Sequence, residues 1–285
     1  MIEDVEIRCA DRVTLRASLR EPVGESFGTA ILAHAMFARR GEFERAGFAE
    51  HFARRGWRTI AFDFRGHGDS DGKGTEYRYD DFVMHDLPAV TEAARARSDG
   101  RPVVVIGHSL GGHVALAAQG IGTMRADAIV GIASNVWMRR TERSSRVRLV
   151  QHAVLRAVMA IVARRGYFPA RALRQGSDDE SASYMRDLAR FVFDDKWGSA
   201  DGAHDYTAAL SAIDVPVYSL ATAGDRLAAR PDAVCELHRM ARAELDVVTA
   251  SDAGGRAPSH IGIVTTRSAV SAWSRVEAFL RERLA

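Results

Sequence analysis

The stretch that decides the fold is Val103-Val104-Val105-Ile106-Gly107-His108-Ser109-Leu110-Gly111. It begins with a continuous apolar run, which is typical of a parallel β-strand covered on both faces. The run leads through the pattern Gly-x-Ser-x-Gly into a segment rich in Ala, Leu and Val, which predicts a helix. Glycines on both sides of the serine remove the Cβ atoms that would collide where a strand folds back against a helix. The stretch therefore predicts a sharp turn that holds Ser109 at the end of a buried strand.

A serine at such a turn is placed as a nucleophile. Its hydroxyl reacts only when the turn exposes it and a neighbouring base accepts its proton. A helix that starts at Leu110 directs free N–H groups and its dipole toward the reacting carbonyl. We predict that Ser109 is the nucleophile and that the backbone N–H of Leu110 is one oxyanion donor. A chance match is the alternative in a chain with 24 glycines, but the placement between strand and helix favours the catalytic interpretation.

The acid and the base are expected later in the chain, in the order Ser, Asp or Glu, His. His260 is the last of ten histidines and follows the last predicted strand, so we predict that it is the base. Asp225 follows the predicted strand 217–221 and would accept the imidazole N–H, which fixes the tautomer of the base. Asp214 and Asp232 are weaker candidates for the acid, because the first precedes this strand and the second falls in the next predicted helix.

Short apolar or β-branched runs alternate with helical patterns along most of the chain. This alternation predicts an α/β fold, an eight-stranded, mostly parallel sheet flanked by helices. The predicted strands are 5–9, 13–19, 29–33, 58–62, 103–107, 128–133, 217–221 and 245–249. The predicted helices are 42–55, 79–97, 110–119, 231–242 and 267–283. The first two strands alternate in polarity, as an antiparallel edge would.

The alternation breaks once, between the sixth and the seventh predicted strand, where helical patterns occur without a convincing strand. We expect a helical cap inserted after the sixth strand at 137–206, over an α/β core formed by 1–136 and 207–285. Apolar residues with helical spacing in this segment either pack on the core or line an acyl pocket above Ser109. A basic stretch beside them is usually a solvated face, and it is also compatible with anionic substrates or a membrane surface: Arg139, Arg140, Arg143, Arg146 and Arg148.

Two further segments complete a family resemblance. His34-Ala35-Met36-Phe37 follows the strand 29–33, and Asp63-Phe64-Arg65-Gly66-His67-Gly68-Asp69-Ser70 is similar to the turn D-x-R-G-H-G-x-S. Together with the serine motif, they make the chain resemble the α/β-hydrolase superfamily, especially its serine-aminopeptidase and monoacylglycerol-lipase-like branch of capped esterases and lipases. The resemblance covers the core and leaves out the cap.

The resemblance implies that the backbone N–H of Met36 is the second oxyanion donor, and that His34 and the turn 65–70 shape the site without taking part in the chemistry. Ala35 stands where such families usually have glycine. This departure leaves open whether Met36 or Phe37 presents the donor. His108 and His113 are interpreted as packing residues.

The predicted function is a serine hydrolase that cleaves a carboxylic ester or related acyl bond of a small to medium lipophilic substrate. The reaction passes through an acyl-Ser109 intermediate and needs no organic cofactor and no metal. An acyltransferase would use the same triad with another acceptor in place of water. A non-catalytic ligand-binding protein on this fold is disfavoured, because Ser109, Asp225 and His260 all stand in the expected order.

The amino-acid composition narrows the classes of molecule that the protein is expected to bind. The chain carries 39 Lys and Arg against 37 Asp and Glu, a net charge of +2, which does not indicate a nucleic-acid surface. The expected partner is a small-molecule acyl substrate, and the sequence leaves the oligomeric state open. An acidic N-terminus without signal-peptide features, and no apolar run of about 18 residues, predict a cytoplasmic protein without a transmembrane segment. Two cysteines are too few for a disulfide framework.

Overall fold

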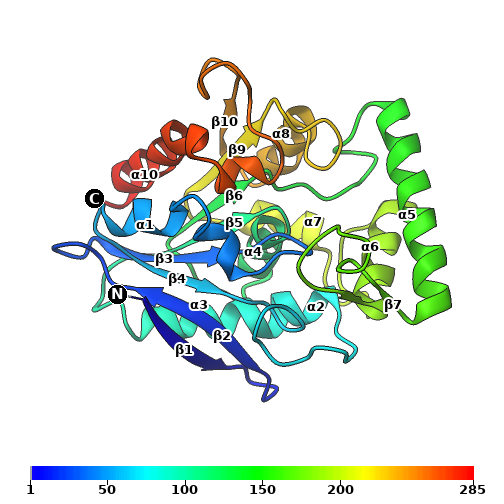
Figure 1. Ribbon diagram of the computed structural model, residues 1–285, viewed down its shortest axis with the longest axis horizontal. Helices are drawn as coiled ribbons and strands as arrows, with labels where there is room; N and C mark the ends of the chain where they lie inside the picture. The colour runs from blue at the N-terminus through cyan, green and yellow to red at the C-terminus, as the bar shows by residue number, and fades with distance from the viewer. Residues whose placement is uncertain (1) are drawn as a thin grey trace.

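The computed structural model describes residues 2–285 and contains the predicted eight-stranded sheet (Figure 1). The order of the strands is β1-β2-β4-β3-β5-β6-β9-β10. Only β2 pairs antiparallel to its neighbours, β1 and β4, and all other pairs are parallel. The strands are β1 (Ile2–Arg8), β2 (Thr14–Arg20), β3 (Gly28–Ala33), β4 (Trp57–Phe62), β5 (Val103–His108), β6 (Ala128–Ile132), β9 (Val217–Thr222) and β10 (Glu244–Val248). All eight predicted strands are confirmed.

Successive side chains of each strand point to opposite faces of the sheet, so two apolar layers form, one on each face. Val103 and Val105 pack with α3 (Leu87–Arg95) and α4 (Leu110–Gly120). Val104 and Ile106 face the other way and pack with α1 (Phe48–Ala53) and α10 (Val270–Leu284), while α8 (Pro231–Arg239) covers β9. Figure 1 shows α3 on the opposite side of the sheet from α1 and α10. Helices on both faces explain why the central strands are apolar without alternation.

Three predicted helices are less regular than their sequence patterns. The predicted helix 42–55 is a 3₁₀ turn, η1 (Arg40–Phe43), followed by the short α1. Gly47 between them has a φ of +83°, which an α-helix does not contain. The predicted helix 79–97 starts as α2 (Tyr79–Asp81), passes through a π turn, η2 (Phe82–Asp86), and continues as α3. A 3₁₀ turn, η4 (Arg267–Ala269), precedes α10.

The chain between β6 and β9 contains α5 (Ser145–Arg165), α6 (Ala182–Phe193), α7 (Tyr206–Ala209) and η3 (Leu210–Ala212). Figure 1 shows α5 and α6 beside the sheet, whereas α7 and η3 pack against α4. This part of the chain also contains an antiparallel pair that the sequence analysis did not predict, β7 (Tyr167–Phe168) with β8 (Glu180–Ser181). Strands of two residues are too short to produce a periodic pattern. No helix within residues 2–285 is both long and apolar enough to cross a bilayer.

Candidate active site

The turn after β5 has the geometry that the sequence predicts. Ser109 has φ 50° and ψ −109°, a conformation that non-glycine residues rarely adopt. A Cβ on Gly107 would lie 2.3 Å from the carbonyl carbon of Gly111, and a Cβ on Gly111 would lie 2.2 Å from the carbonyl oxygen of Ala33. The backbone N–H of Ser109 donates to the carbonyl oxygen of Ile132 at 2.9 Å. Close approach of β5, α4 and β3 therefore requires glycine here, and the strain is concentrated at Ser109.

Asp225 and His260 meet although they lie 35 positions apart in the chain. His260 Nδ1 lies 2.6 Å from Asp225 Oδ2. Asp225 follows β9, and His260 lies just before α9 (Gly262–Thr265), so both come from loops at the carboxyl ends of parallel strands, where β5 also ends. The hydroxyl of Ser109 forms no hydrogen bond with another residue of the part that the structure describes. Hydrogen bonds of catalytic groups often form only with substrate bound.

Backbone donors hold the Asp225 carboxylate in its ionised form. Oδ1 accepts the N–H groups of Leu227 and Ala228 at 3.1 and 3.0 Å, and Oδ2 accepts that of Ala229 at 2.8 Å. Burial acts to raise the pKa of Asp225, but His260 and the backbone donors outweigh it, so the pKa is lowered. An ionised Asp225 accepts the Nδ1–H of His260 and leaves Nε2 free to accept a proton.

The hydrogen bonds of the loop after β3, residues 34–37, distinguish the two candidate oxyanion donors, Met36 and Phe37. The backbone N–H of Phe37 donates to Glu180 Oε1 at 2.9 Å, so it is already occupied. The backbone N–H of Ala35 donates to Glu42 Oε1 at 2.9 Å. The N–H groups of Met36 and Leu110 have no acceptor among residues 2–285. Within the described chain, the only free N–H in the stretch 35–37 is therefore that of Met36.

Glu42 and His108 form a buried pair behind this loop. Nδ1 of His108 lies 3.1 Å from Glu42 Oε2, and its Nε2 lies 3.0 Å from the backbone carbonyl oxygen of His260. Burial acts to lower the pKa of His108, but Glu42 outweighs it, so the pKa is raised. An imidazolium can donate to both oxygens. His108 does more than pack, because it joins the loop before α1 to the loop that carries His260.

Glu180 and His67 form a second buried pair on the other side of the loop. Nε2 of His67 lies 3.1 Å from Glu180 Oε1, its Nδ1 lies 3.0 Å from the carbonyl oxygen of Arg65, and the Tyr77 hydroxyl donates to Glu180 Oε2 at 2.8 Å. Burial acts to lower the pKa of His67, but the charge of Glu180 and the hydrogen bonds of the ring to Glu180 and Arg65 raise it to about 9. Glu180 belongs to β8, so the segment between β6 and β9 contributes directly to the position of Phe37.

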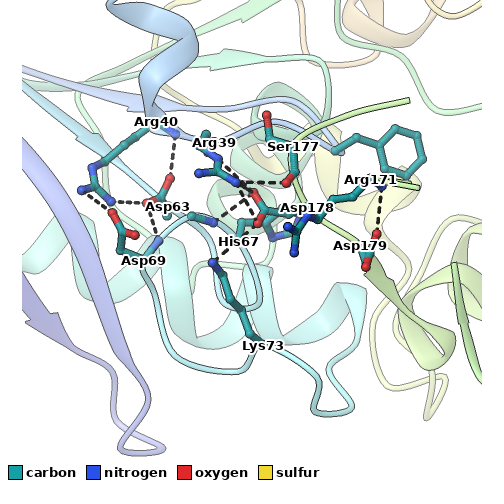
Figure 2. A network of polar contacts seen from close by, with 12 residues as sticks. Arg39, Arg40, Asp63, His67, Asp69, Lys73, Arg171, Ser177, Asp178 and Asp179 are labelled. Carbon is teal, nitrogen blue, oxygen red and sulfur yellow. Dashed lines mark hydrogen bonds and ion pairs between the residues drawn. The ribbon is translucent and has the colours of Figure 1, made fainter. Parts of the chain in front are cut away.

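Asp178 attaches the same segment to the turn 65–70 (Figure 2). Its carboxylate accepts two hydrogen bonds from the Arg39 guanidinium, each 3.1 Å long, and a third from the backbone N–H of Gly68 at 3.2 Å. On the core side, Asp63 accepts the N–H groups of Arg40 and Asp69 at 2.7 and 3.1 Å. The turn therefore joins the core to the segment between β6 and β9, behind the loop 34–37 that follows β3.

Glu42 and Glu180 were not predicted as site residues, and no local signal marks them. His67 lies in the turn that carries the family resemblance, and His108 lies next to Ser109, so both histidines were within reach of the sequence analysis. His34 is buried, and its Nε2 accepts the N–H of Phe64 at 3.1 Å.

Comparison with known proteins defines the family. Residues 24–251 match the family described as serine aminopeptidase, S33, a region that contains Ser109 and Asp225 and ends before His260. The chain belongs to the serine aminopeptidase S33 family. The resemblance to the α/β-hydrolase superfamily is therefore confirmed.

Relatives of this S33 family member differ widely in sequence. The chain is 33% identical to the lysophosphatidylserine lipase ABHD12 of Xenopus tropicalis over 95 residues. These residues make up 33% of this chain and 24% of that protein. The match thus spans about a quarter of the curated relative. The Pyrococcus furiosus esterase Pf2001 superposes with a TM-score of 0.66 at 18% identity, covering 100% and 92% of the two chains. DcsB, in complex with its substrate analogue, superposes with a TM-score of 0.70 at 16% identity over 100% of both chains. These superpositions show the α/β-hydrolase fold.

A cavity of about 470 Å³ adjoins the loop after β3 of the S33 family member. Met36 contributes to its wall, and so does Ile261, the neighbour of His260. The complete lining is Met36, Phe37, Ala38, Arg39, Glu42, Arg45, Arg171, Arg174, Gln175, Gly176, Ser177 and Ile261. The cavity therefore combines apolar side chains with several arginines.

One group of side chains has the spacing of metal ligands. Asp11, Asp81 and His85 offer ligand atoms within 4.8 Å of one another. The guanidinium of Arg65 already lies 2.7 Å from Asp11 and 3.7 Å from Asp81, so the positive charge of this side chain already pairs with both carboxylates. The group lies outside the set of candidate catalytic residues.

The pair of His67 and Glu180 predicts a pH-dependent stability. The folded-state pKa of His67 is about 9, against about 6.5 in an unfolded chain. Folding therefore favours the protonated form, and this contribution is complete below about pH 6.5 and disappears as the pH rises through about 9. The free energy of unfolding should fall by an amount on the order of 3 kcal/mol over this range. Urea unfolding at several pH values measures it.

The matched variants for this measurement are Glu180→Gln and Glu92→Gln. Glu180→Gln removes the charge that raises the pKa of His67, so its stability should change less between pH 6.5 and 9.5. Glu92 is exposed, so Glu92→Gln should follow the parent. Parallel pH profiles for the parent and Glu180→Gln would contradict the assignment.

Proposed function

We propose that this chain is a serine hydrolase that cleaves a carboxylic ester or a related acyl bond through an acyl-Ser109 intermediate. The observation that carries the proposal is the 2.6 Å contact between Asp225 and His260 at the sheet edge where Ser109 occupies its strained turn. Membership in a family of serine aminopeptidases supports hydrolysis at an acyl carbon. The names of two similar proteins, a lysophosphatidylserine lipase and an esterase, support an ester as the bond.

The proposed reaction has two halves. Nε2 of His260 accepts the proton of Ser109 Oγ while Oγ attacks the carbonyl carbon, and the carbonyl oxygen becomes an oxyanion. When the tetrahedral intermediate collapses, the bond to the alcohol breaks and His260 returns the proton to the leaving oxygen. Water then attacks the acyl-serine with the same help, which releases the acid and restores Ser109. Asp225 stabilises the imidazolium in both halves.

The N–H groups of Met36 and Leu110 are the proposed oxyanion donors. Both lack an acceptor within the described residues, whereas that of Phe37 is bound to Glu180. Donors that are already fixed and unoccupied stabilise a developing negative charge without reorganisation. Glu42 and Glu180 support this role by holding the N–H groups on either side of Met36.

The proposed substrate is a small to medium lipophilic ester, and the segment 137–206 is the proposed cap over the site. The cavity of about 470 Å³ is large enough for such a molecule, and Met36, Phe37 and Ile261 offer apolar contacts in it. On α5, Val158 and Met159 pack against a buried apolar cluster, and the helix contacts α6 and β7 of its own segment, while Leu149 is 69% exposed. Packing within the segment between β6 and β9 thus accounts for part of the helix's apolar surface.

Labelling with a fluorophosphonate tests this proposal. The probe should modify the native protein at one residue, and mass spectrometry should find the adduct on Ser109, because only an activated serine reacts at neutral pH. His260→Ala should prevent labelling, since the serine then lacks its base. An unlabelled native protein, or an adduct on another serine, would refute the mechanism.

A further inference from the structure

The cavity beside Met36 carries an excess of positive charge. Arginines from two parts of the chain line it. Arg39 and Arg45 belong to the segment between β3 and α1, and Arg171 and Arg174 belong to the turn between β7 and β8. These two parts lie more than a hundred positions apart, so the tertiary structure brings four guanidinium groups to one cavity.

Within residues 2–285, only one of these arginines has a carboxylate partner. Arg39 binds Asp178 through two hydrogen bonds of 3.1 Å (Figure 2). The other three, Arg45, Arg171 and Arg174, form no ion pair with any residue in the part of the chain that the structure describes. All three are exposed, so their charges are available to a ligand in the cavity.

The acidic side chains nearby are already bound elsewhere. Glu42 also lines the cavity, but its carboxylate accepts the N–H of Ala35 and pairs with His108. Asp179 accepts the backbone N–H of Arg171 at 2.9 Å, as Figure 2 shows, and forms no ion pair with its guanidinium. About three positive charges therefore remain without an internal counter-charge in this part of the molecule.

The turn that carries Arg171 and Arg174 is fixed relative to the loop 34–37, which carries the proposed oxyanion donor Met36. The backbone N–H of Ser177 donates to the carbonyl oxygen of Phe37 at 2.7 Å. Arg174 has a φ of +56°, a conformation that arginine rarely adopts. Three backbone hydrogen bonds close the turn: Leu173 to Pro169, Arg174 to Arg171 and Gln175 to Ala170. The arginines thus stand at a defined position beside Met36.

We propose that this cavity binds an anionic group, a carboxylate or a phosphate, carried by the ester that Ser109 cleaves. This inference rests on the proposed function and narrows its substrate class. Guanidinium groups bind carboxylate and phosphate oxygens through paired N–H donors, and the paired donors give direction as well as charge. An ester carbonyl held by the Met36 N–H leaves the rest of the molecule next to the arginines, because Met36 lines the same cavity. The substrate is then an ester with a short apolar chain and one anionic group.

Two pairs of esters test the anionic group and distinguish its source. The first pair is mono-p-nitrophenyl adipate and p-nitrophenyl hexanoate, which differ in a carboxylate at the end of the acyl chain. The second pair is 1-hexanoylglycerol 3-phosphate and 1-hexanoylglycerol, which differ in a phosphate on the alcohol. In at least one pair the anionic ester should have a kcat/KM at least about tenfold above its neutral partner. The pair that shows the preference identifies the carboxylate or the phosphate.

The variants are Arg171→Gln combined with Arg174→Gln, and, as a matched control, Arg164→Gln combined with Arg165→Gln. Arg164 and Arg165 are exposed arginines of the same segment that do not line the cavity. The first double variant should lower the ratio of anionic to neutral kcat/KM at least about tenfold, because two of the guanidinium donors are lost. The control should keep the ratio of the parent. High salt should reduce the preference of the parent protein for the anionic ester over its neutral partner, since exposed charges are screened.

Calorimetric titration of Ser109→Ala with the two anionic esters separates this proposal from the proposed function. Binding that is weakened by the Arg171 and Arg174 substitutions supports the anion site even if the parent cleaves no ester. Two results overturn the proposal: equal kcat/KM within both pairs of esters, and an equal loss of the ratio in the control double variant.

Discussion

Replacing Ser109 by alanine is expected to lower kcat by about 10⁵- to 10⁶-fold while the protein stays folded. The expected loss is large because the proposed mechanism uses the Ser109 hydroxyl to form the acyl-enzyme, and the other two proposed triad residues cannot act without it. Stability should change little, since Ser109 is only half-buried and its Oγ has no hydrogen-bond partner within residues 2–285. A Tm within about 2 °C of the parent is expected. Steady-state hydrolysis of p-nitrophenyl hexanoate and a thermal melt measure the two quantities.

A second serine provides the control for this prediction. Ser211 is exposed, and its hydroxyl bonds only to the carbonyl oxygen of Ala208. Ser211→Ala should therefore retain the activity of the parent. If Ser109→Ala turned over esters as fast as Ser211→Ala, the acyl-enzyme mechanism would have to be abandoned.

Replacing Asp225 by asparagine is expected to lower kcat by about 10³- to 10⁴-fold. Each hydrogen bond that this carboxylate forms within residues 2–285 comes from a donor: Oδ1 faces the N–H groups of Leu227 and Ala228, and Oδ2 faces those of Ala229 and His260. An amide NH₂ in the Oδ2 position forces His260 into the tautomer whose Nε2 carries a proton and cannot accept that of Ser109.

An amide NH₂ in the Oδ1 position meets two backbone donors instead. Leaving these N–H groups without an acceptor costs about 1–3 kcal/mol each, so this substitution should also lower the free energy of unfolding. Chemical denaturation and the pH dependence of kcat/KM report the two effects separately. Asp232→Asn and Asp214→Asn are the controls, because both side chains are exposed and neither contacts His260. A silent Asp225→Asn, or a large loss in one of the controls, would move the acid to another residue.

Local sequence patterns determined the sheet. The central strands are continuous apolar runs because helices cover both of their faces, and each run is short and bounded by loop residues. The turn at Ser109 was also readable, since no other residue type can replace glycine where β5, α4 and β3 approach within contact distance. Where local conformation overrode the pattern, as at Gly47, the predicted helix 42–55 broke into η1 and α1.

Chain order determined the candidates for the acid and the base, because strands of a parallel sheet bring their following loops to one edge. This reasoning placed Asp225 and His260 together, and the structure brings them to 2.6 Å. Their catalytic role remains a proposal that the substitutions above test.

Only the tertiary structure decided how the loop after β3, with its proposed oxyanion donor, is held and what lines the cavity. Glu180 reaches Phe37 across 143 positions, and Glu42 reaches His108 across 66. A contact between residues so far apart leaves no periodic pattern in the sequence, and a glutamate that binds a buried histidine looks like any surface glutamate there. The same holds for Arg45, Arg171 and Arg174, which share one cavity only because the turn between β7 and β8 packs against the loop after β3. Local patterns therefore determined the sheet and the order of the candidate catalytic residues, while long-range packing decided which backbone donor is free and which charges face the cavity.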